Sequence, residues 1–232
     1  MHSPTIRFSK PSAQIALFEI DAPPANALGG DLRRKFLEGL AAVEQDFAVR
    51  AVVVTGHRHA FCSGDDLKER EAALQGGGGD AAASFHVLVD RIEACRAPVI
   101  AAVNGWAIGG GLELALGCDI RIASTQAQFV CAAVNVGLIA SAWRLPRLIG
   151  VARAKHMLLT GLPFDAATAE RFGLVSSVHP PETLADAALA LAERIATRAP
   201  LRWRRPSAWQ ARRSISIPTE RHACCKRSSK CW

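Results

Sequence analysis

Two patterns of apolar residues alternate through the first 200 residues of the chain: short continuous runs and a spacing of three or four residues. Residues 15–20, 50–56 and 99–103 are short runs dominated by aliphatic side chains and bounded by proline or glycine. Such runs are typical of strands, and the continuous run at 50–56 is typical of a strand covered on both faces of a sheet. The sequence therefore predicts a strand in each run, with a turn at Pro23-Pro24 after the first.

Helical spacing appears between these strands. Apolar side chains recur every three or four residues over 32–43 and again over 85–92. This period predicts two amphipathic helices, with the basic residues Arg33–Lys35 on the solvent side of the first. The four glycines at 76–79 predict a flexible loop before the second helix.

Capping residues mark the elements predicted between residues 150 and 200. Gly161 is expected to end a helix that begins after Gly150, and Asp165 is expected to cap a helix over 166–172. Gly173 ends that helix. The remaining predicted elements are a strand at 174–178 and an alanine-rich amphipathic helix at 183–196.

Strands that alternate with helices at these distances favour an α/β fold. Short connections of this kind build right-handed βαβ or ββα units around a mostly parallel sheet. A chain of 232 residues with 50% hydrophobic content can bury a sizeable core. We therefore expect one catalytic domain over residues 1–200 and an atypical appendage over 201–232.

Composition narrows the class of protein. The chain has no run of about 18 uncharged apolar residues and no apolar signal-peptide segment near its first residues. Its seven cysteines have no regular spacing, which is typical of reduced thiols rather than a disulfide framework. These features predict a soluble cytoplasmic protein with no membrane partner.

The positive charge is concentrated at one end. The formal net charge is +7, but residues 201–232 hold nine of the 28 Lys and Arg residues and one of the 21 acids. The first 200 residues are therefore nearly neutral. A nearly neutral body does not indicate a nucleic-acid surface, so we expect no nucleic-acid partner.

Two longer motifs carry the candidate chemistry. Residues 61–69 read FCSGDDLKE, and residues 98–123 read PVIAAVNGWAIGGGLELALGCDIRIA. Each motif predicts a strand, a turn and the start of a helix, where main-chain N–H groups lack intrahelical partners. Two such N–H groups that face one point form an oxyanion hole. Three consecutive glycines at 109–111 exceed what a tight turn needs and leave the backbone open to a ligand.

These two motifs closely resemble the signature segments of the crotonase (enoyl-CoA hydratase/isomerase) superfamily, over about residues 5–200. The resemblance implies a crotonase-like (ClpP/crotonase) spiral of ββα units, packed as two near-perpendicular sheets with surrounding helices. It implies that an acyl-CoA thioester is polarised between the N–H groups of Asp65 and Gly110. It also implies that Asp65, Asp66, Leu67 and Lys68 line the path of coenzyme A, which is part of the substrate and not a cofactor.

Asp65 departs from the family pattern, which usually has a small residue, often alanine, at this position. Its carboxylate either turns outward or acts as a catalytic group. Asp65 and Asp66 are also well suited to cap the following helix. We interpret Asp65 as acting through its main chain, with both carboxylates as caps.

Glu113 and Ala133 decide which reaction is expected. Glu113 is an acid in the first turn of a very apolar helix, where an acid also favours the helix dipole. The resemblance places Glu113 on one of two hydratase glutamates that handle water, and it places Ala133 where the second should stand, in the substrate site. A methyl group can neither orient nor deprotonate water, so the reaction expected from the family is weakened.

The predicted function is enoyl-CoA hydratase or isomerase chemistry through a stabilised enolate, with Glu113 as the acid or base. One alternative is another enolate reaction, such as decarboxylation of a malonyl-type thioester, which needs no paired glutamates. A catalytically impaired acyl-CoA-binding protein is the other alternative. The resemblance further implies a homotrimer or hexamer.

Residues 201–232 do not follow the family, whose C-terminal helices lock the trimer and cover part of the ligand pocket. They contain three of the five tryptophans and three of the seven cysteines, without an apolar period. The composition is what a frameshift or truncation would give. A natural basic extension and a tail that binds nucleic acid or membrane are the alternatives.

Other candidate residues give weaker signals. His57, His59 and Cys62 could form a metal cluster, but histidines are common in the loop after a strand, and we predict no metal. Ser63 and Ser141 have no companion motif of an activated nucleophile. Asn135, Ser141 and Trp143 are near enough to Ala133 in sequence to line an acyl pocket, although a structural role is expected for each.

Overall fold

The computed structural model describes residues 3–66, 69, 84–138 and 140–198. The glycine loop at 76–79, Leu67, Lys68 and the basic appendage at 201–232 lie outside these residues. No helix within the described ranges is both long enough and apolar enough to cross a membrane.

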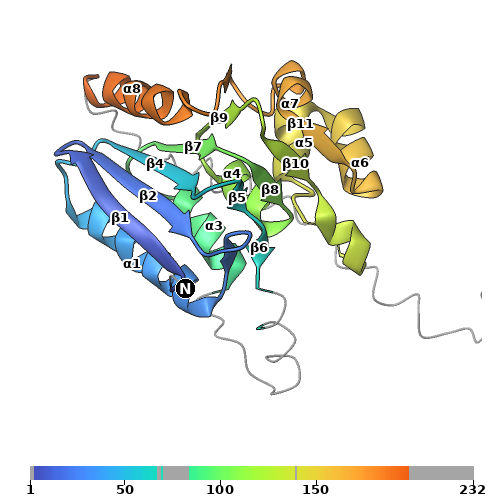
Figure 1. Ribbon diagram of the computed structural model, residues 1–232, viewed down its shortest axis with the longest axis horizontal. Coiled ribbons are helices and arrows are strands. Elements are labelled where there is room, and N and C mark those ends of the chain that lie inside the picture. Colours follow the sequence, from blue (N-terminus) through green and yellow to red (C-terminus); the bar gives the residue numbers. More distant parts are fainter. Residues whose placement is uncertain (1–2, 67–68, 70–83, 139, 199–232) are drawn as a thin grey trace, which may run out of the picture. The chain divides into compact units, whose positions relative to one another are not determined.

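A six-stranded sheet forms the main layer (Figure 1). Its outer strand pairs antiparallel with the second, and the remaining pairs are parallel. The three strands predicted at 15–20, 50–56 and 99–103 are confirmed as the second, third and fourth of this sheet. In spatial order the strands are β1 (Thr5–Ser12), β2 (Ile15–Asp21), β4 (Ala51–Gly56), β7 (Val99–Val103), β9 (Ile120–Ser124) and β12 (Val178–His179).

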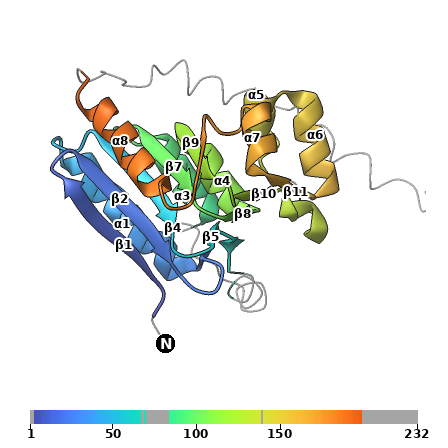
Figure 2. The same ribbon diagram turned by 45° about the horizontal axis from the view of Figure 1, so that its top comes forward.

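Helices cover both faces of this sheet (Figures 1 and 2). On one face Val52 and Val54 share a core with Phe36 of helix α1, whereas on the other Val53 shares a core with Leu184 of helix α8. Alternate residues of β4 therefore enter different cores, which explains why the whole strand is apolar. The helices are α1 (Gly30–Gln45), α3 (Phe85–Glu93) and α4 (Gly110–Gly117) on the first face and α8 (Leu184–Ala196) on the second.

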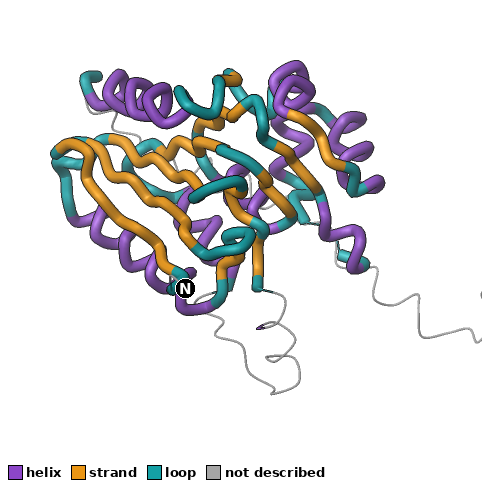
Figure 3. The backbone as a smooth tube through the Cα atoms, viewed as in Figure 1, coloured by secondary structure: helices purple, strands orange, loops and turns teal. Residues whose placement is uncertain are grey.

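A second, smaller sheet takes up the chain after β4, β7 and β9 of the main sheet. The order of its strands is β11 (Pro163–Asp165), β10 (Gln128–Val130), β8 (Trp106–Ile108) and β5 (Ala60–Cys62). The chain runs from β4 into β5. It also runs from β7 through β8 into α4, and these three elements form a ββα unit (Figure 3). The predicted α/β fold of ββα units is confirmed. A separate pair, β3 (Ala27–Leu28) and β6 (Gly64–Asp65), runs parallel beside it.

The C-terminal part of the described chain is largely helical. Asp165 caps α7 as predicted, since its Oδ1 accepts a hydrogen bond of 2.8 Å from the Thr168 N–H. Gly161 and Gly173, both with positive φ, end α6 and α7 as predicted. The elements are the 3-10 helix η2 (Ala132–Val136), α5 (Arg144–Ile149), α6 (Val151–Thr160) and α7 (Ala166–Phe172).

The strand predicted at 174–178 is wrong for most of its length. Only Val178 belongs to a strand, β12. The Leu174 N–H donates instead to the Ala169 carbonyl at 2.8 Å, which completes the end of α7, and the Ser176 N–H donates to the Arg121 carbonyl at 2.8 Å. Apolar residues at 174–175 therefore pack against the core in a helix-terminating turn, and the apolar run alone could not distinguish this turn from a strand.

Candidate active site

The two sequence motifs meet where β6 approaches the start of α4. A Cβ atom on Gly64 would lie 2.8 Å from the Gly110 nitrogen, and one on Gly111 would lie 1.8 Å from the Cys62 carbonyl oxygen. Gly64 also has a φ of +93°, which residues with a side chain rarely adopt. Glycine is therefore required for this close approach. We call this contact between residues 62–65 and 109–111 the backbone cradle.

Gly110 presents an N–H group that its helix cannot satisfy. It is the first residue of α4, and an α-helix provides no carbonyl acceptor for its first N–H groups. Gly109, with a φ of +51°, turns the chain from β8 into α4, and its own N–H donates to the Val130 carbonyl at 2.9 Å. The turn is thus fixed by β10, and the Gly110 N–H is available to an acceptor from outside the helix.

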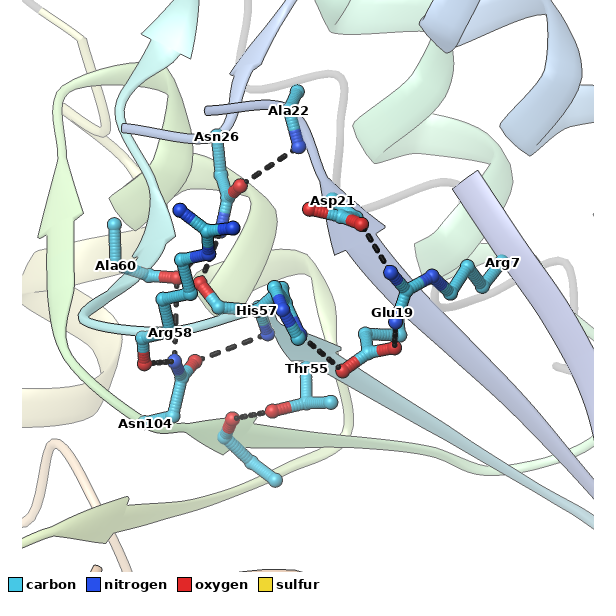
Figure 4. Close-up of polar contacts among 12 residues, drawn as sticks. Arg7, Glu19, Asp21, Ala22, Asn26, Thr55, His57, Arg58, Ala60 and Asn104 are labelled. Carbon is cyan, nitrogen blue, oxygen red and sulfur yellow. Dashed lines mark hydrogen bonds and ion pairs between the residues drawn. The ribbon is translucent and has the colours of Figure 1, made fainter. Parts of the chain in front are cut away.

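Two asparagines hold the loop that leads into the cradle (Figure 4). The Asn26 amide donates to the His57 carbonyl at 3.0 Å and to the Ala60 carbonyl at 2.7 Å, while its oxygen accepts from the Ala22 N–H at 2.9 Å. The Asn104 amide donates to the Ala60 carbonyl at 3.2 Å, and its oxygen accepts from the Gly56 N–H at 3.0 Å. Both side chains therefore converge on Ala60, the first residue of β5.

Asp65 and Asp66 behave differently from one another. Oδ1 of Asp66 accepts from the Glu69 N–H at 3.4 Å, in the manner of a cap. Oδ1 of Asp65 accepts instead from Arg33 Nη1 at 2.6 Å. Asp65 is therefore paired with α1, and the N–H groups of residues 67 and 68, which an Asp65 cap would serve, lie outside the described residues, so its capping role stays a prediction.

The prediction that Arg33 lies on the solvent side of α1 is wrong. Its side chain is 13% exposed and its Nη1 donates to the Leu28 carbonyl at 2.6 Å as well as to Asp65. The prediction failed because a long side chain at the boundary of an amphipathic helix can bend back to bury its stem.

Glu113 lies buried in the first turn of α4, 5% exposed. The Ser141 hydroxyl donates to its Oε1, and Arg144 Nη1 donates to its Oε2 at 3.2 Å. Both oxygens therefore have a donor, and the positive guanidinium compensates the carboxylate charge that burial disfavours. Ser141 has a φ of +60°, and its carbonyl accepts from the Leu145 N–H at the start of α5.

Arg144 joins Glu113 to helix α3. Its Nη2 lies 3.0 Å from Asp90 Oδ1 and 2.8 Å from Glu93 Oε2, and the arginine side chain is 7% exposed. The Trp143 ring stacks on the guanidinium, with 4.0 Å between the carbon of the guanidinium and the ring centroid. We call Glu113, Ser141, Arg144, Asp90 and Glu93 the Glu113 cluster. It places one cation among three carboxylates.

A pocket that opens to solvent lies beside the cradle, and the space in it, open solvent included, is about 240 Å³. Gly109 and Leu112 line it from the α4 side, and Cys131, Ala133 and Ser141 line it from the opposite segment. The pocket is therefore continuous with the turn into α4 and touches the Glu113 cluster through the Ser141 hydroxyl. Ala133 presents a methyl group there, at the position singled out in the sequence.

The other sequence candidates are used elsewhere. Asn135 is exposed, and Trp143 stacks on arginines with 39% of its surface exposed. His57 Nδ1 lies 3.0 Å from Glu19 Oε1 (Figure 4), and the Cys62 sulfur accepts from the Gly64 N–H. Burial raises the pKa of the Cys62 thiol to about 12. In the described part of the chain, no three His, Cys, Asp or Glu side chains are arranged so that they could hold a metal ion.

Sequence reasoning missed Arg33, Arg144, Asp90 and Glu93 as members of the site. Asp90 and Glu93 are three residues apart. This spacing predicts that they share one face of a helix, but it does not predict which residue contacts that face. Arg144 lies 31 residues from Glu113 along the chain. The sequence shows that charged residues stand next to apolar stripes, and this was the only signal for these four residues. It does not show which charges pair, because pairing across such separations depends on the fold.

Comparison with known proteins agrees with the fold and the motifs. Residues 10–213 match the enoyl-CoA hydratase/isomerase family. The chain is 39% identical over 195 residues to the (E)-benzylidenesuccinyl-CoA hydratase of Thauera aromatica, covering 82% of this chain and 76% of that protein. It is 39% identical over 179 residues to the 1,2-epoxyphenylacetyl-CoA isomerase of Escherichia coli strain K12, covering 74% and 68%. The crystal structure of an enoyl-CoA hydratase from Bacillus anthracis matches with a TM-score of 0.77 and 35% identity, over 84% of this chain and 78% of that one. The chain belongs to the enoyl-CoA hydratase/isomerase family.

Proposed function

We propose that the protein is an enzyme that binds an acyl-CoA thioester and stabilises its enolate between the N–H groups of Asp65 and Gly110. The observation that carries this proposal is the contact of Gly64 with Gly110, where a Cβ would lie 2.8 Å from the Gly110 nitrogen. This contact brings a strand end and a helix start to one point beside the pocket. Main-chain donors fixed in such positions stabilise an oxyanion without reorganising during the reaction.

Glu113 is the proposed acid or base. Hydration of an enoyl thioester adds a water oxygen to the β-carbon, and the resulting enolate takes a proton at the α-carbon. Isomerisation removes a proton from one carbon and returns it to another. Ser141 lines the pocket and its hydroxyl donates to Glu113, so we propose this hydroxyl as a path for a proton between Glu113 and a bound ligand. With a methyl group at Ala133, we expect slow hydration.

Decarboxylation of a malonyl-type thioester is the second candidate, and the lining of the pocket favours it. Among the described residues, those that line the pocket are neutral and include no carboxylate. In this reaction the bond between the α-carbon and the carboxylate breaks, carbon dioxide leaves, and the electron pair forms the enolate. A proton then binds the α-carbon. The cradle is needed, but a second glutamate is not.

The test uses the purified chain with crotonyl-CoA and methylmalonyl-CoA in parallel. Loss of absorbance from the conjugated double bond measures hydration, and trapped carbon dioxide measures decarboxylation. Turnover of either thioester supports the proposed enolate chemistry and identifies which reaction it serves. Thioester binding without any turnover would favour an impaired acyl-CoA-binding protein. Failure to bind either thioester, at concentrations up to about 1 mM, would contradict the proposed function.

The remaining features of the proposal concern assembly and location. Coenzyme A enters as part of the substrate, and we propose no further cofactor and a cytoplasmic location. We also propose a homotrimer or hexamer. Exposed apolar side chains around η2 and α6, including Val136, Val151, Leu159 and Leu162, support self-association. Because residues 201–232 lack an apolar helical period, the assembly is expected to dissociate at higher concentration than is usual for such oligomers, which light scattering on dilution measures.

A further inference from the structure

We propose that Arg33 is a positioning residue for the oxyanion hole: it holds the Asp65 carboxylate against α1 and neutralises its charge, so that the Asp65 main chain can serve an enolate. This inference rests on the proposed function. It concerns a side chain that lies beside the cradle and touches the reacting group only through Asp65.

The contacts of Arg33 connect both strands of the small β3–β6 pair. Its Nη1 lies 2.6 Å from Asp65 Oδ1 and 2.6 Å from the Leu28 carbonyl oxygen. Leu28 and Asp65 are register partners in this parallel pair. One guanidinium nitrogen therefore spans the two residues that face each other at the end of the cradle, and it fixes where the Asp65 carboxylate lies.

Burial makes the ion pair more effective than an ordinary surface pair. The Arg33 side chain is 13% exposed and the Asp65 side chain 31% exposed. Charges in such partly buried positions are less screened by water than charges on the surface. The neighbouring Arg34–Asp31 pair on the same helix is 53% and 84% exposed, so it is expected to contribute little.

An uncompensated carboxylate at Asp65 would oppose the reaction. The N–H of Asp65 is proposed to stabilise a developing negative charge, and its carboxylate is on the same residue. The carboxylate therefore lies close to the proposed oxyanion. Repulsion between like charges raises the energy of the enolate more than that of the neutral thioester. Arg33 removes this penalty by pairing with the carboxylate and directing it toward α1. Its loss should therefore lower kcat more than it raises KM.

The experiment is a double-mutant cycle with Arg33→Met and Asp65→Ala. In the protein that has Asp65, Arg33→Met is expected to lower kcat on the order of tenfold, with little change in KM. In the Asp65→Ala background, the same change is expected to lower kcat less than twofold, since no carboxylate remains to be compensated. Arg34→Met is the matched control and should leave kcat unchanged. Far-UV circular dichroism verifies that each variant is folded.

A second readout does not depend on turnover. Acetoacetyl-CoA ionises to an enolate that absorbs in the near ultraviolet, so its titration on the protein reports the electrostatics of the oxyanion hole. Arg33→Met should move the midpoint of this titration to higher pH by about one unit, and the shift should vanish in the Asp65→Ala background. Arg33→Lys keeps the charge and should restore most of the wild-type midpoint if Arg33→Met proves poorly folded.

The two proposals can fail separately. Equal effects of Arg33→Met in both backgrounds would show a merely structural role and overturn the inference, while the wild-type protein still formed the enolate. An unchanged kcat and midpoint in Arg33→Met would overturn it as well. If the wild-type protein bound acetoacetyl-CoA without stabilising its enolate, the proposed function itself would be wrong, and the role of Arg33 with it.

Discussion

The backbone cradle contains the turn into α4, the Glu113 cluster includes a residue of the first turn of that helix, and the two are built in opposite ways. The cradle uses main-chain atoms, and its packing requires the absence of side chains at Gly64 and Gly111. The Glu113 cluster uses long charged side chains from three helices, with one arginine among three carboxylates. The cradle therefore depends on close packing over a few residues, whereas the cluster depends on charge balance across distant segments.

Because the two regions are built differently, substitutions disrupt them in different ways. Adding atoms to the cradle displaces backbone that cannot move independently of β5 and α4. Removing a charge from the cluster leaves a buried partner without compensation. Catalysis should respond most to changes in the cradle, and stability should respond most to changes in the cluster.

The largest effect on stability is expected for Arg144→Met. The change leaves Glu113, 6% exposed in its side chain, without its guanidinium donor, and breaking a buried pair in this way costs about 3–5 kcal/mol. Urea denaturation at pH 7 measures the loss. Arg147→Met is the control, since Arg147 is exposed on the same helix and also stacks on Trp143. A similar midpoint for Arg144→Met and Arg147→Met would show that the cluster does not depend on charge balance.

The next effect concerns the cradle and compares Gly110→Pro with Gly110→Ala. A Cβ at Gly110 would lie 3.0 Å from the Gly64 Cα and 3.0 Å from the Phe85 ring, so both variants add the same Cβ contacts, while proline adds its ring carbons on the nitrogen as well. Only the proline also removes the N–H donor, and loss of one oxyanion donor lowers kcat about 10²–10³-fold. We expect Gly110→Pro to be slower than Gly110→Ala by most of this factor. Equal rates in two folded variants would exclude the Gly110 N–H as a donor.

The cradle was more predictable from the sequence than the Glu113 cluster, because the cradle is built from local segments. The cradle is local in sequence: each motif predicts a strand, a glycine turn and a helix start, and both motifs were found from residues 61–69 and 98–123. The strands at 15–20, 50–56 and 99–103 and the helices at 32–43 and 85–92 were likewise predicted from their periods, because each period reflects burial on one face. The fold brings the two halves together, and the close approach of Gly64 to Gly110 shows that they meet.

The side-chain contacts were much less predictable. Arg33 follows Leu32 on an amphipathic helix, where a basic residue is normally solvated, yet it turns back to Asp65. Arg144 pairs with residues more than 30 positions away. Periodicity describes which face of an element is buried, but it contains no information about which charged ends meet. Residues 174–175 show the same limit for apolar side chains, since helix ends and strands bury them equally well.

A smaller effect on turnover is expected for Glu113→Gln, which keeps the shape of the side chain and removes its charge. Arg144 retains Asp90 and Glu93, so the protein should remain folded. Turnover of whichever thioester proves active in the assay of crotonyl-CoA and methylmalonyl-CoA should fall about 10²-fold, as is usual for loss of a general acid or base. Ala133→Glu is the complementary variant and should raise crotonyl-CoA hydration by placing a carboxylate in the pocket, in addition to that of Glu113. An undiminished rate in Glu113→Gln would mean that another group transfers the proton.

The smallest effect at neutral pH is expected for two buried thiols, one in the cradle and one in the lining of the pocket. Cys62 belongs to the cradle and Cys131 lines the pocket. Burial raises the pKa of both thiols from 9.0 to about 12, opposed at Cys62 by the Gly64 N–H and reinforced at Cys131 by the charge of Glu113. Both are therefore neutral at pH 7, where they should influence neither turnover nor charge balance.

Their influence should appear above pH 9. Unfolded thiols then release protons that the folded thiols retain, so the stability that is fully present below pH 9 declines as the pH rises toward 12, by about 1.4 kcal/mol per pH unit for each thiol. Urea denaturation at pH 8, 9, 10 and 11 measures this slope for the wild type, Cys62→Ala and Cys131→Ala. Each variant should lose the contribution of one thiol and show a shallower decline, whatever its stability at pH 8. A decline as steep in Cys131→Ala as in the wild type would show that the pocket thiol already ionises with an ordinary pKa, and that the pocket admits more water than its apolar lining indicates.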